Sequence, residues 1–272
     1  MAEAIEWDRF GGRHPTRIVH VPAEVHERLP NADVMPIHEY VAKNVGIRRA
    51  RGEFVLSTNP DLLLDRKLTR WLAGAQLCRD CFYRVDRFDV LEAPPDGDPD
   101  AALRFCARHV WRVHTLGRSL SFARPPAGWR RAAWSVLGRY GLRASVPRGG
   151  DPLTRLHTNA SGDFLAMHRD HWHSLHGYPE LGVSGHADSY MCVMALAAGL
   201  GQRALGPRYR IYHQEHPRAV DWSDIAASTR PVADFAEFDA RARAMLRGDE
   251  PFVYNGEDWG LAFEELEEVV SA

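Results

Sequence analysis

The chain has 272 residues, a formal net charge of −2 at pH 7, 45% hydrophobic residues and 26% charged residues. These values are typical of a folded protein with one or two compact domains, and they exclude a disordered chain and a strongly basic nucleic-acid-binding protein. No apolar run approaches the ~20 residues of a membrane-spanning helix, and the N-terminus MAEAIEWDRF lacks the pattern of a secretory signal. We therefore expect a cytoplasmic protein that has no transmembrane segment, has no nucleic acid partner and is bound to a membrane at most peripherally.

Strand and helix patterns alternate in the first third of the chain. Residues 17–21 are a short β-branched run, residues 37–50 contain an amphipathic helix, Phe54–Thr58 is an apolar strand, and residues 62–72 resume helical spacing. This βαβα order predicts an α/β fold with a mainly parallel central sheet flanked by helices.

The middle of the chain gives fewer indications. Residues 92–100 are polar and broken by prolines, which predicts a loop, and residues 101–111 are predicted to be helical. Residues 117–151 are rich in Arg, Gly and Pro and show no period, so they fit either a lid over a site or an irregular surface excursion.

Regular patterns return after that segment. Residues 163–167 and 209–213 are predicted strands, residues 169–175 a short helix, and residues 189–198 a helix with Asp188 as its N-cap.

Two peripheral helices are predicted near the end of the chain, at residues 235–246 and 261–270. They would make residues 223–272 a C-terminal helical extension of a domain that spans residues 1–222.

The chain contains four cysteines, which are Cys78, Cys81, Cys106 and Cys192. Four are too few for a disulfide scaffold in a chain of this length, and they fit a reducing compartment. Cys78 and Cys81 form a C-x-x-C motif, but no second pair lies at zinc-ribbon spacing and the flanking WLAGAQL is typical of a helix end. We therefore interpret all four as plain structural side chains, and a metal or redox role for Cys78 and Cys81 is the alternative.

The most informative motif is Asn59-Pro60-Asp61, which directly follows the predicted strand Phe54–Thr58. Ligands bind at the carboxyl ends of strands in open α/β sheets, and two oxygen-bearing side chains suit a hard divalent cation. The alternative is a simple turn in which Asn59 caps the next helix.

The pattern around this motif, Lys-Asn-x-Gly-Ile-x-x-Ala-x-Gly-Glu-Phe-Val-Leu starting at Lys43, resembles the family 2 glycosyltransferases of the GT-A fold. In that family an R/K-N-x-G helix precedes a strand that ends in a D-x-D metal motif. The resemblance implies a GT-A-like (Rossmann-like) fold in which Asp61 binds Mn²⁺ or Mg²⁺ on the diphosphate of a nucleotide sugar. It also places Lys43, Asn44 and Asn59 on the substrate side. Asn59 stands where the family has aspartate, so metal binding would be weaker or partly replaced by arginines.

A second block, residues 159–169 followed by Gly177-Tyr178-Pro179-Glu180, resembles the acceptor-side segment of the same enzymes. Gly162 would let the backbone approach the substrate closely, and Asp163 would accept hydrogen bonds from sugar hydroxyls. The alternative for Asp163 is a solvated carboxylate in a turn.

A third block, from Gly185 to Tyr190, lies where the family carries its acidic pair. The resemblance makes Asp188 the candidate base that takes the proton of the attacking hydroxyl, although a helix N-cap explains it equally well. His186, where an acidic residue is common, is the second catalytic candidate, either as a base or as an acceptor contact.

The predicted strand at residues 209–213 ends in two histidines, His213 and His216. Many GT-A enzymes use a late histidine as an additional metal or phosphate ligand, and imidazole can complete a site that Asp61 begins. The alternative is that both are ordinary polar residues at a strand end.

Together these blocks predict a metal-assisted glycosyltransferase that moves a sugar from a nucleotide-diphosphate donor to a hydroxyl acceptor. A non-catalytic relative that binds a sugar or a partner protein is the alternative, because the family's opening unit is shortened ahead of residues 5–7. A His/Asp metal hydrolase is disfavoured because Asp61, His213 and His216 match no compact motif such as H-E-x-x-H.

Overall fold

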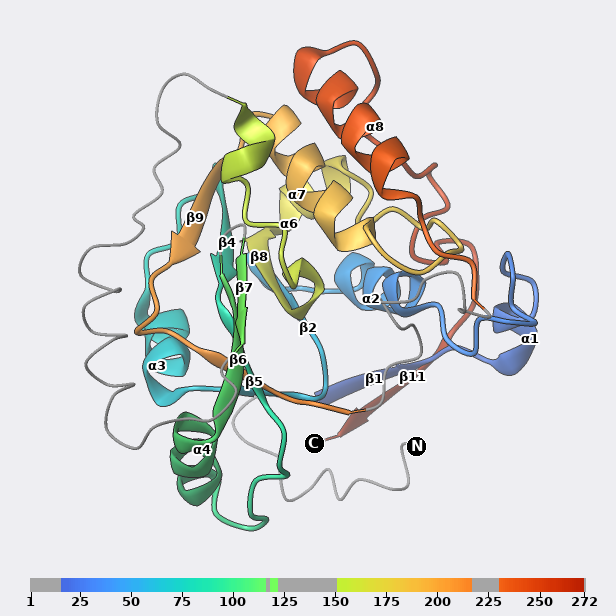
Figure 1. Cartoon of the computed structure of the whole chain (residues 1–272). Helices are drawn as coiled ribbons and strands as arrows, with labels where there is room; N and C mark the ends of the chain where they lie inside the picture. The colour runs from blue at the N-terminus through green and yellow to red at the C-terminus, as the bar shows by residue number, and fades with distance from the viewer. Residues whose placement is uncertain (1–15, 116–117, 122–150, 217–229, 272) are drawn as a thin grey trace.

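The computed structural model describes residues 16–115, 118–121, 151–216 and 230–271. The first part contains β1 (Thr16–His20), α1 (Ala23–His26), α2 (Glu39–Arg48), β2 (Phe54–Thr58), β3 (Leu62–Leu64), α3 (Arg66–Gly74), β4 (Cys81–Val85), β5 (Arg87–Val90), α4 (Pro99–Arg108), β6 (Val110–Thr115) and β7 (Arg118–Ser121). The later part contains two short 3-10 turns, η3 (Pro152–Arg155) and η4 (Ser161–Asp163), and then β8 (Phe164–His168), α6 (Arg169–Ser174), α7 (Ala187–Ala197), β9 (Gly201–Leu205), β10 (Ile211–Gln214), α8 (Phe235–Arg247) and β11 (Glu267–Ser271). Figure 1 shows how the helices lie around the strands.

The prediction of a mixed α/β fold is confirmed, but the sheets are not mainly parallel in the described residues. Six strand pairings are antiparallel, and two, β4 with β9 and β5 with β10, are parallel. In the four-stranded sheet β2-β8-β4-β9, the strands β2, β4 and β9 point the same way, whereas β8 runs oppositely between β2 and β4. The local βαβα pattern cannot reveal this insertion, because β8 comes from a much later segment of the chain.

Each face of the four-stranded sheet packs against its own helices. On β4 and β8, Phe82, Leu165 and Met167 belong to the large core cluster that includes α7 and α6. The residues that alternate with them, such as Tyr83 and Ala166, pack with Leu68 of α3 in a second cluster. The sheet is therefore covered by helices on both faces, which is why nearly all of its inner residues are buried.

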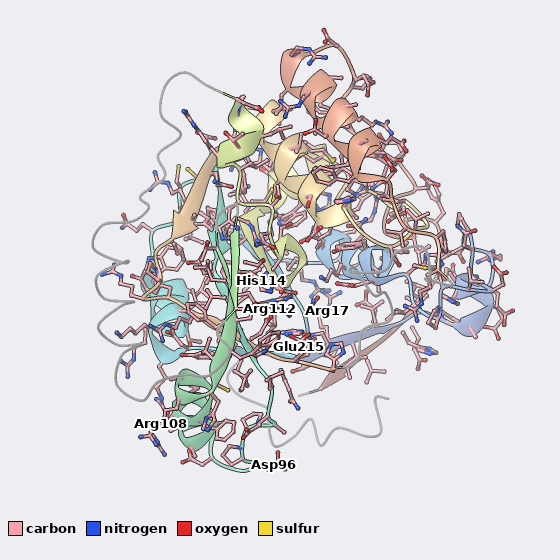
Figure 2. The ribbon with its side chains drawn as sticks, viewed as in Figure 1. Arg17, Asp96, Arg108, Arg112, His114 and Glu215 are labelled. Atoms are coloured by element: carbon pink, nitrogen blue, oxygen red, sulfur yellow. The ribbon has the colours of Figure 1, made fainter. Side chains whose placement is uncertain are left out.

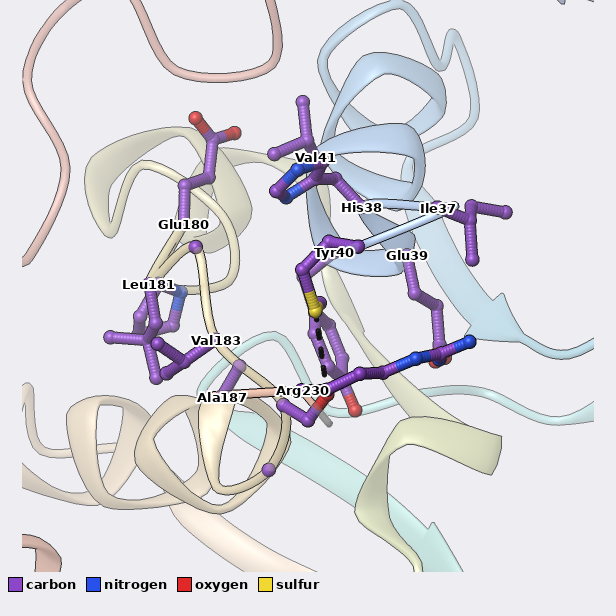
Figure 3. Close-up of a pocket in the computed structure, with 15 residues that line it drawn as sticks. Ile37, His38, Glu39, Tyr40, Val41, Glu180, Leu181, Val183, Ala187 and Arg230 are labelled. Atoms are coloured by element: carbon purple, nitrogen blue, oxygen red, sulfur yellow. Dashed lines mark hydrogen bonds between the residues drawn. The ribbon is translucent and has the colours of Figure 1, made fainter. Parts of the chain in front are cut away.

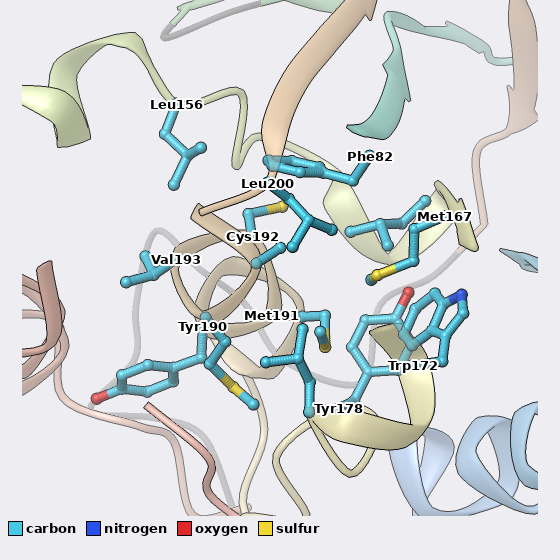
Figure 4. Packing of buried hydrophobic residues seen from close by; sticks show 14 of the residues in the cluster. Phe82, Leu156, Met167, Trp172, Tyr178, Tyr190, Met191, Cys192, Val193 and Leu200 are labelled. Atoms are coloured by element: carbon cyan, nitrogen blue, oxygen red, sulfur yellow. The ribbon is translucent and has the colours of Figure 1, made fainter. Parts of the chain in front are cut away.

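The helix α7 is a core helix with a fixed position. Residues Tyr190 to Ala195 are all at most 4% exposed, and Figure 4 shows Met191 on the side of α7 that faces Trp172, Cys192 near Leu200, and Val193 on another side of the helix. A helix that is apolar on every side is buried on every side, so α7 has little freedom to move. The first turn of α7, which carries Asp188, is anchored by this packing.

The five-stranded sheet, in the order β3-β10-β5-β6-β7, corrects two predicted boundaries. The predicted helix at residues 62–72 begins instead with β3, which pairs with β10, and α3 starts only after Asp65, whose side chain caps the amide of Leu68. The predicted helix at residues 101–111 likewise ends at Arg108 and is followed by β6. In both cases a strand partner that is distant in sequence decides the local conformation.

The C-terminal segment combines a helix with a strand. The predicted helix at residues 235–246 is confirmed as α8, which packs its Phe238, Ala242 and Met245 into the core cluster of α7. The predicted helix at residues 261–270 is wrong, because β11 pairs antiparallel with β1 (Figure 1). The segment 223–272 is therefore not purely helical, and the division of the chain at residue 222 stays a prediction.

Two of the segments discussed in the sequence analysis lie mostly or wholly outside the described residues. Apart from β7 and Asp151, the segment 117–151, predicted to be a lid or an irregular excursion, lies outside the described residues, as do residues 5–7. Across the described helices, none has both the length and the apolar character that crossing a bilayer requires.

Candidate metal and substrate site

Strand pairing brings Asp61 and the two late histidines together. Because Leu62 of β3 lies opposite His213 of β10, the preceding residue, Asp61, reaches the end of β10. Oδ2 of Asp61 lies 3.2 Å from Nε2 of His213 and 3.2 Å from Nε2 of His216. One ligand atom from each of the three residues lies within 4.8 Å of the others, which is a spacing that fits one metal ion.

His213 is held between two carboxylates. Its Nε2 faces Asp61, and its Nδ1 lies 3.4 Å from Oδ1 of Asp89 on the neighbouring strand β5. Burial lowers the pKa of His213, but hydrogen bonding to Asp61 and Asp89 outweighs burial and raises the pKa to about 9. At this pKa the ring is protonated near neutral pH, so a cation that binds Nε2 would displace that proton, while Asp89 faces Nδ1 and orients the ring.

Asp89 is the centre of a buried ion network. It is fully buried and contacts Nε of Arg87 at 2.8 Å, Nε of Arg112 at 2.6 Å and Nε2 of His114 at 3.0 Å. Burial alone would raise the pKa of Asp89, but hydrogen bonds from His114 and His213 and the charge of Arg87 hold it well below its usual value. Figure 2 shows Arg112, His114 and Glu215 grouped around this point.

Two sets of residues have the spacing of a metal site, and the charges around them differ. The set Asp89, His213 and Glu215 also has ligand atoms within 4.8 Å of one another. However, Arg112 already contacts both Asp89 and Glu215 at 2.6 Å, so a divalent cation there would be repelled by a guanidinium. By contrast, Oδ1 of Asp61 is buried and has no hydrogen-bond partner within the described residues. The set Asp61, His213 and His216 therefore fits a cation better.

Asp163 joins this network from the other side. Its Oδ1 accepts a hydrogen bond from Asn59 Nδ2 at 2.8 Å, and its Oδ2 accepts one from Arg87 Nη1 at 2.7 Å. Asp163 is only 5% exposed, so it is not a solvated turn carboxylate. Asn59 does not cap the next helix either, since that N-cap is Asp65. Arg87 thus bridges Asp163 to Asp89 and, through Asp89, to His213.

Gly162 lies where three polar side chains converge. Its amide donates to Oδ2 of Asp188 at 2.7 Å, and its carbonyl accepts from Nζ of Lys43 at 2.7 Å. A Cβ at this position would lie 2.7 Å from the hydroxyl of Tyr40, which is closer than side chains approach. Only glycine therefore allows Lys43, Asp188 and Tyr40 to meet at this turn.

A buried arginine shapes the turn that carries Gly162. Arg84 of β4 is fully buried and donates to the carbonyls of His157, Asn159 and Ser161 at 3.0, 3.1 and 3.2 Å. Ala160 in this turn has φ 53, the left-handed region that a non-glycine residue rarely adopts. Such a conformation persists only where surrounding contacts enforce it, and Arg84 supplies those contacts.

A pocket of about 160 Å³ opens beside this turn. It lies between the start of α2 and the segment that leads into α7, and its wall combines apolar residues such as Leu181 and Val183 with charged ones such as Glu180 (Figure 3). Tyr40 also lines the pocket, and its hydroxyl lies at Gly162. The pocket therefore adjoins the cluster that contains Asp188.

Two of the predicted residues are engaged elsewhere. Asn44 is fully buried, donates to the carbonyl of Tyr178 and to Oε1 of Glu180, and accepts from the amide of Tyr178, all at 2.8 Å. Its side chain therefore holds the loop before α7 in place.

The ring of His186 stacks on Phe238 of α8 with a centroid distance of 4.8 Å and an angle of 8°. His186, not Asp188, is the N-cap position of α7.

Sequence reasoning missed the charged residues that connect the candidates, namely Arg84, Arg87, Asp89, Arg112 and His114. A signal was present, since residues 84–90 read RVDRFDV and place several charges within a short, otherwise apolar run. Charges inside a buried strand indicate a paired network.

Comparison with known proteins adds no match. No family model matches the chain, and no curated protein matches it. The indications of function are the polar network and the side chains that compose it.

Proposed function

We propose that this protein is a glycosyltransferase that moves a sugar from a nucleotide-diphosphate donor to a hydroxyl acceptor with the help of a divalent cation. The observation that carries the proposal is the continuity of the site. From Asp61 the contacts run through His213, Asp89 and Arg87 to Asp163. Asp61, which the resemblance assigns to the donor side, and Asp163, which it assigns to the acceptor side, thus belong to one connected network.

The donor end of the network is the cluster of Asp61, His213 and His216. A divalent cation bound there would neutralise the charge that develops on the diphosphate as it leaves the sugar. Two imidazoles and one carboxylate suit Mn²⁺ better than Mg²⁺, because Mg²⁺ prefers oxygen ligands and keeps several waters. Asp89 orients His213 from behind, and Arg87 and Arg112 keep Asp89 ionised.

The acceptor end is the turn at Gly162, next to the pocket between α2 and α7. Among the described residues, Oδ2 of Asp188 accepts one hydrogen bond, from the amide of Gly162, so this oxygen retains a lone pair for the proton of an attacking hydroxyl. Asp188 lies in the first turn of α7, whose position is fixed by core packing. We prefer Asp188 to His186 as the base, since the ring of His186 stacks on α8.

Asp163 lies between the two ends as a positioning residue. Asn59 and Arg87 each use one hydrogen bond to its carboxylate, and each oxygen keeps further acceptor capacity for a sugar hydroxyl. Asn59 is neutral, and its amide donates a hydrogen bond to Asp163. An aspartate at this position would instead place a second negative charge beside Asp163.

The test measures binding and turnover separately. Purified protein with Mn²⁺ is titrated calorimetrically with uridine, guanosine and thymidine diphosphates, and release of the nucleotide is then measured with the matching nucleotide sugars. We expect one nucleotide to bind and its sugar to be transferred or hydrolysed. Asp61→Asn should abolish turnover, whereas the matched control Asp96→Asn, an exposed loop aspartate, should not change it.

The outcomes separate the alternatives. Binding of a nucleotide diphosphate without turnover favours the non-catalytic binding protein. Absence of any nucleotide binding contradicts the proposal, and turnover that is undiminished in Asp61→Asn contradicts the metal role of Asp61.

A further inference from the structure

A second group of reactive side chains lies away from the candidate site, where the segment after α3 enters β4. Cys81 is the first residue of β4 and is buried, at 6% exposed, whereas Cys78 lies in the preceding loop and is partly exposed. The two thiols interact, and hydrogen bonding to Cys81 is the largest of the effects that lower the pKa of Cys78. One accessible thiol thus lies against one buried thiol.

The neighbouring strand supplies a positive charge to this pair. Strand β9 runs parallel to β4, and Nε of Arg203 donates to Sγ of Cys81 at 3.1 Å. Burial and the contact with Cys78 raise the pKa of Cys81, and the Arg203 guanidinium opposes that rise because it stabilises the thiolate form. The loop is also held in place, because the amide of Cys78 donates to the hydroxyl of Tyr83 at 2.6 Å and the amide of Gly201 donates to the carbonyl of Asp80 at 2.9 Å.

These features favour redox chemistry over metal binding. A zinc site needs further ligands, and the groups of metal-competent side chains within the described residues do not include either cysteine. The Arg203 guanidinium would also repel a cation at Cys81.

We propose that Cys78 and Cys81 form a reversible disulfide by exchange with a small disulfide oxidant such as oxidised glutathione. The Cys78 thiolate attacks one sulfur of the oxidant, which forms a mixed disulfide and releases one glutathione. Cys81 then loses its proton, with Arg203 stabilising the resulting thiolate, and attacks the sulfur of Cys78, which forms the Cys78–Cys81 bond and releases the second glutathione. Two electrons and two protons pass from the cysteine thiols to the oxidant, which ends as two molecules of reduced glutathione.

The other two cysteines provide an internal control. Cys106 and Cys192 are buried, and burial raises the pKa of Cys106 to about 11 and that of Cys192 to about 12. Such thiols react slowly with disulfides because little thiolate is present.

The experiment equilibrates the full chain with mixtures of reduced and oxidised glutathione, quenches with acid, counts the remaining thiols and maps the bonds by peptide mass spectrometry. We expect loss of two of the four thiols and a peptide that links Cys78 to Cys81. Cys81→Ala should stop at a glutathione adduct on Cys78, and Cys78→Ala should leave Cys81 reduced. The control Cys106→Ala should still form the disulfide.

A variant of Arg203 tests the geometry directly. Arg203→Gln should reach the same end point more slowly and accumulate the mixed disulfide on Cys78, because the second step loses its stabilised thiolate. Retention of all four thiols in the wild type, or equal modification of Cys106 and Cys78, would overturn the proposal. A disulfide that links two chains instead of Cys78 to Cys81 would overturn it as well.

Discussion

Nε2 of His213 lies 3.2 Å from Oδ2 of Asp61, and Nδ1 of the same ring lies 3.4 Å from Oδ1 of Asp89. One imidazole therefore links the end of the motif that follows β2 to the buried ion network of β5 and β6. The strand order β3-β10-β5 produces this arrangement. His213 lies on β10, between β3, which Asp61 directly precedes, and β5, which contains Asp89.

The first prediction concerns the metal ligands. His213→Gln and His216→Gln should each weaken Mn²⁺ binding by more than ~10-fold. Loss of a residue that only orients a metal ligand already costs ~10-fold or more in affinity, and loss of the ligand itself should cost at least as much. Calorimetric titration with Mn²⁺ measures the change. His20→Gln, an exposed histidine on β1, is the matched control and should bind Mn²⁺ as the wild type does. Equal affinity in all three variants would remove these histidines from the site.

The second prediction concerns the buried carboxylate of Asp89. Asp89→Asn should lower the free energy of unfolding by about 3–5 kcal/mol, because Arg87 and Arg112 would keep their charges in a buried site without their shared partner. Urea unfolding followed by circular dichroism measures the loss. Asp98→Asn removes an exposed partner of Arg104 and should cost less than about 1 kcal/mol. Similar losses in the two variants would show that the Asp89 network contributes no more than a surface pair.

The third prediction uses the crowding at Gly162. Gly162→Ala should cost about 1–3 kcal/mol of stability and displace the side chain of Tyr40, because the new Cβ would lie 2.7 Å from its hydroxyl. Combining it with Tyr40→Phe removes that hydroxyl, so the double variant should recover part of the loss. Gly74→Ala, where no atom lies within 4 Å of an added Cβ, is the control. Unfolding curves and nucleotide binding report both effects, and a double variant no better than Gly162→Ala would locate the strain elsewhere.

The fourth prediction concerns acid pH and His157. This residue is buried, its Nε2 contacts Oδ1 of Asp86 at 3.0 Å, and burial lowers its pKa despite that contact, with the charge of Arg84 acting in the same direction. The unfolded chain therefore binds a proton at a higher pH than the folded protein does, and the contribution of His157 to stability is lost as pH falls below about 6.5, the pKa of unperturbed histidine. His157→Gln should unfold with a smaller dependence on pH between about 6.5 and 5 than the wild type. The free energy of unfolding is measured by urea titration at several pH values. If it changes with pH equally in His157→Gln and in the wild type, His157 is not a buried neutral histidine.

Several elements were predictable because the signal was local. The strand Phe54–Thr58 was predicted with its observed bounds. The ends of α2, α7 and α8 each lie within two residues of the predicted ends. Residues 62–64 and 267–270 were predicted as helix and are strands, since their partners β10 and β1 lie far away in sequence. Propensity in such short segments is too weak to resist a strand partner.

The length, composition and charge of the chain determined that it could form a folded α/β protein, and its motifs determined which oxygen- and nitrogen-bearing side chains were candidates. Only the tertiary structure decided which of them meet. Asp61, Asp163 and His213 are brought together by strand register and by Arg87, whereas Asn44 and His186 are drawn into packing against Tyr178 and Phe238. The physical reason is that a motif specifies a local conformation and a chemical group, but a contact between distant residues depends on the pairing of strands and on the burial that forces every charge to find a partner.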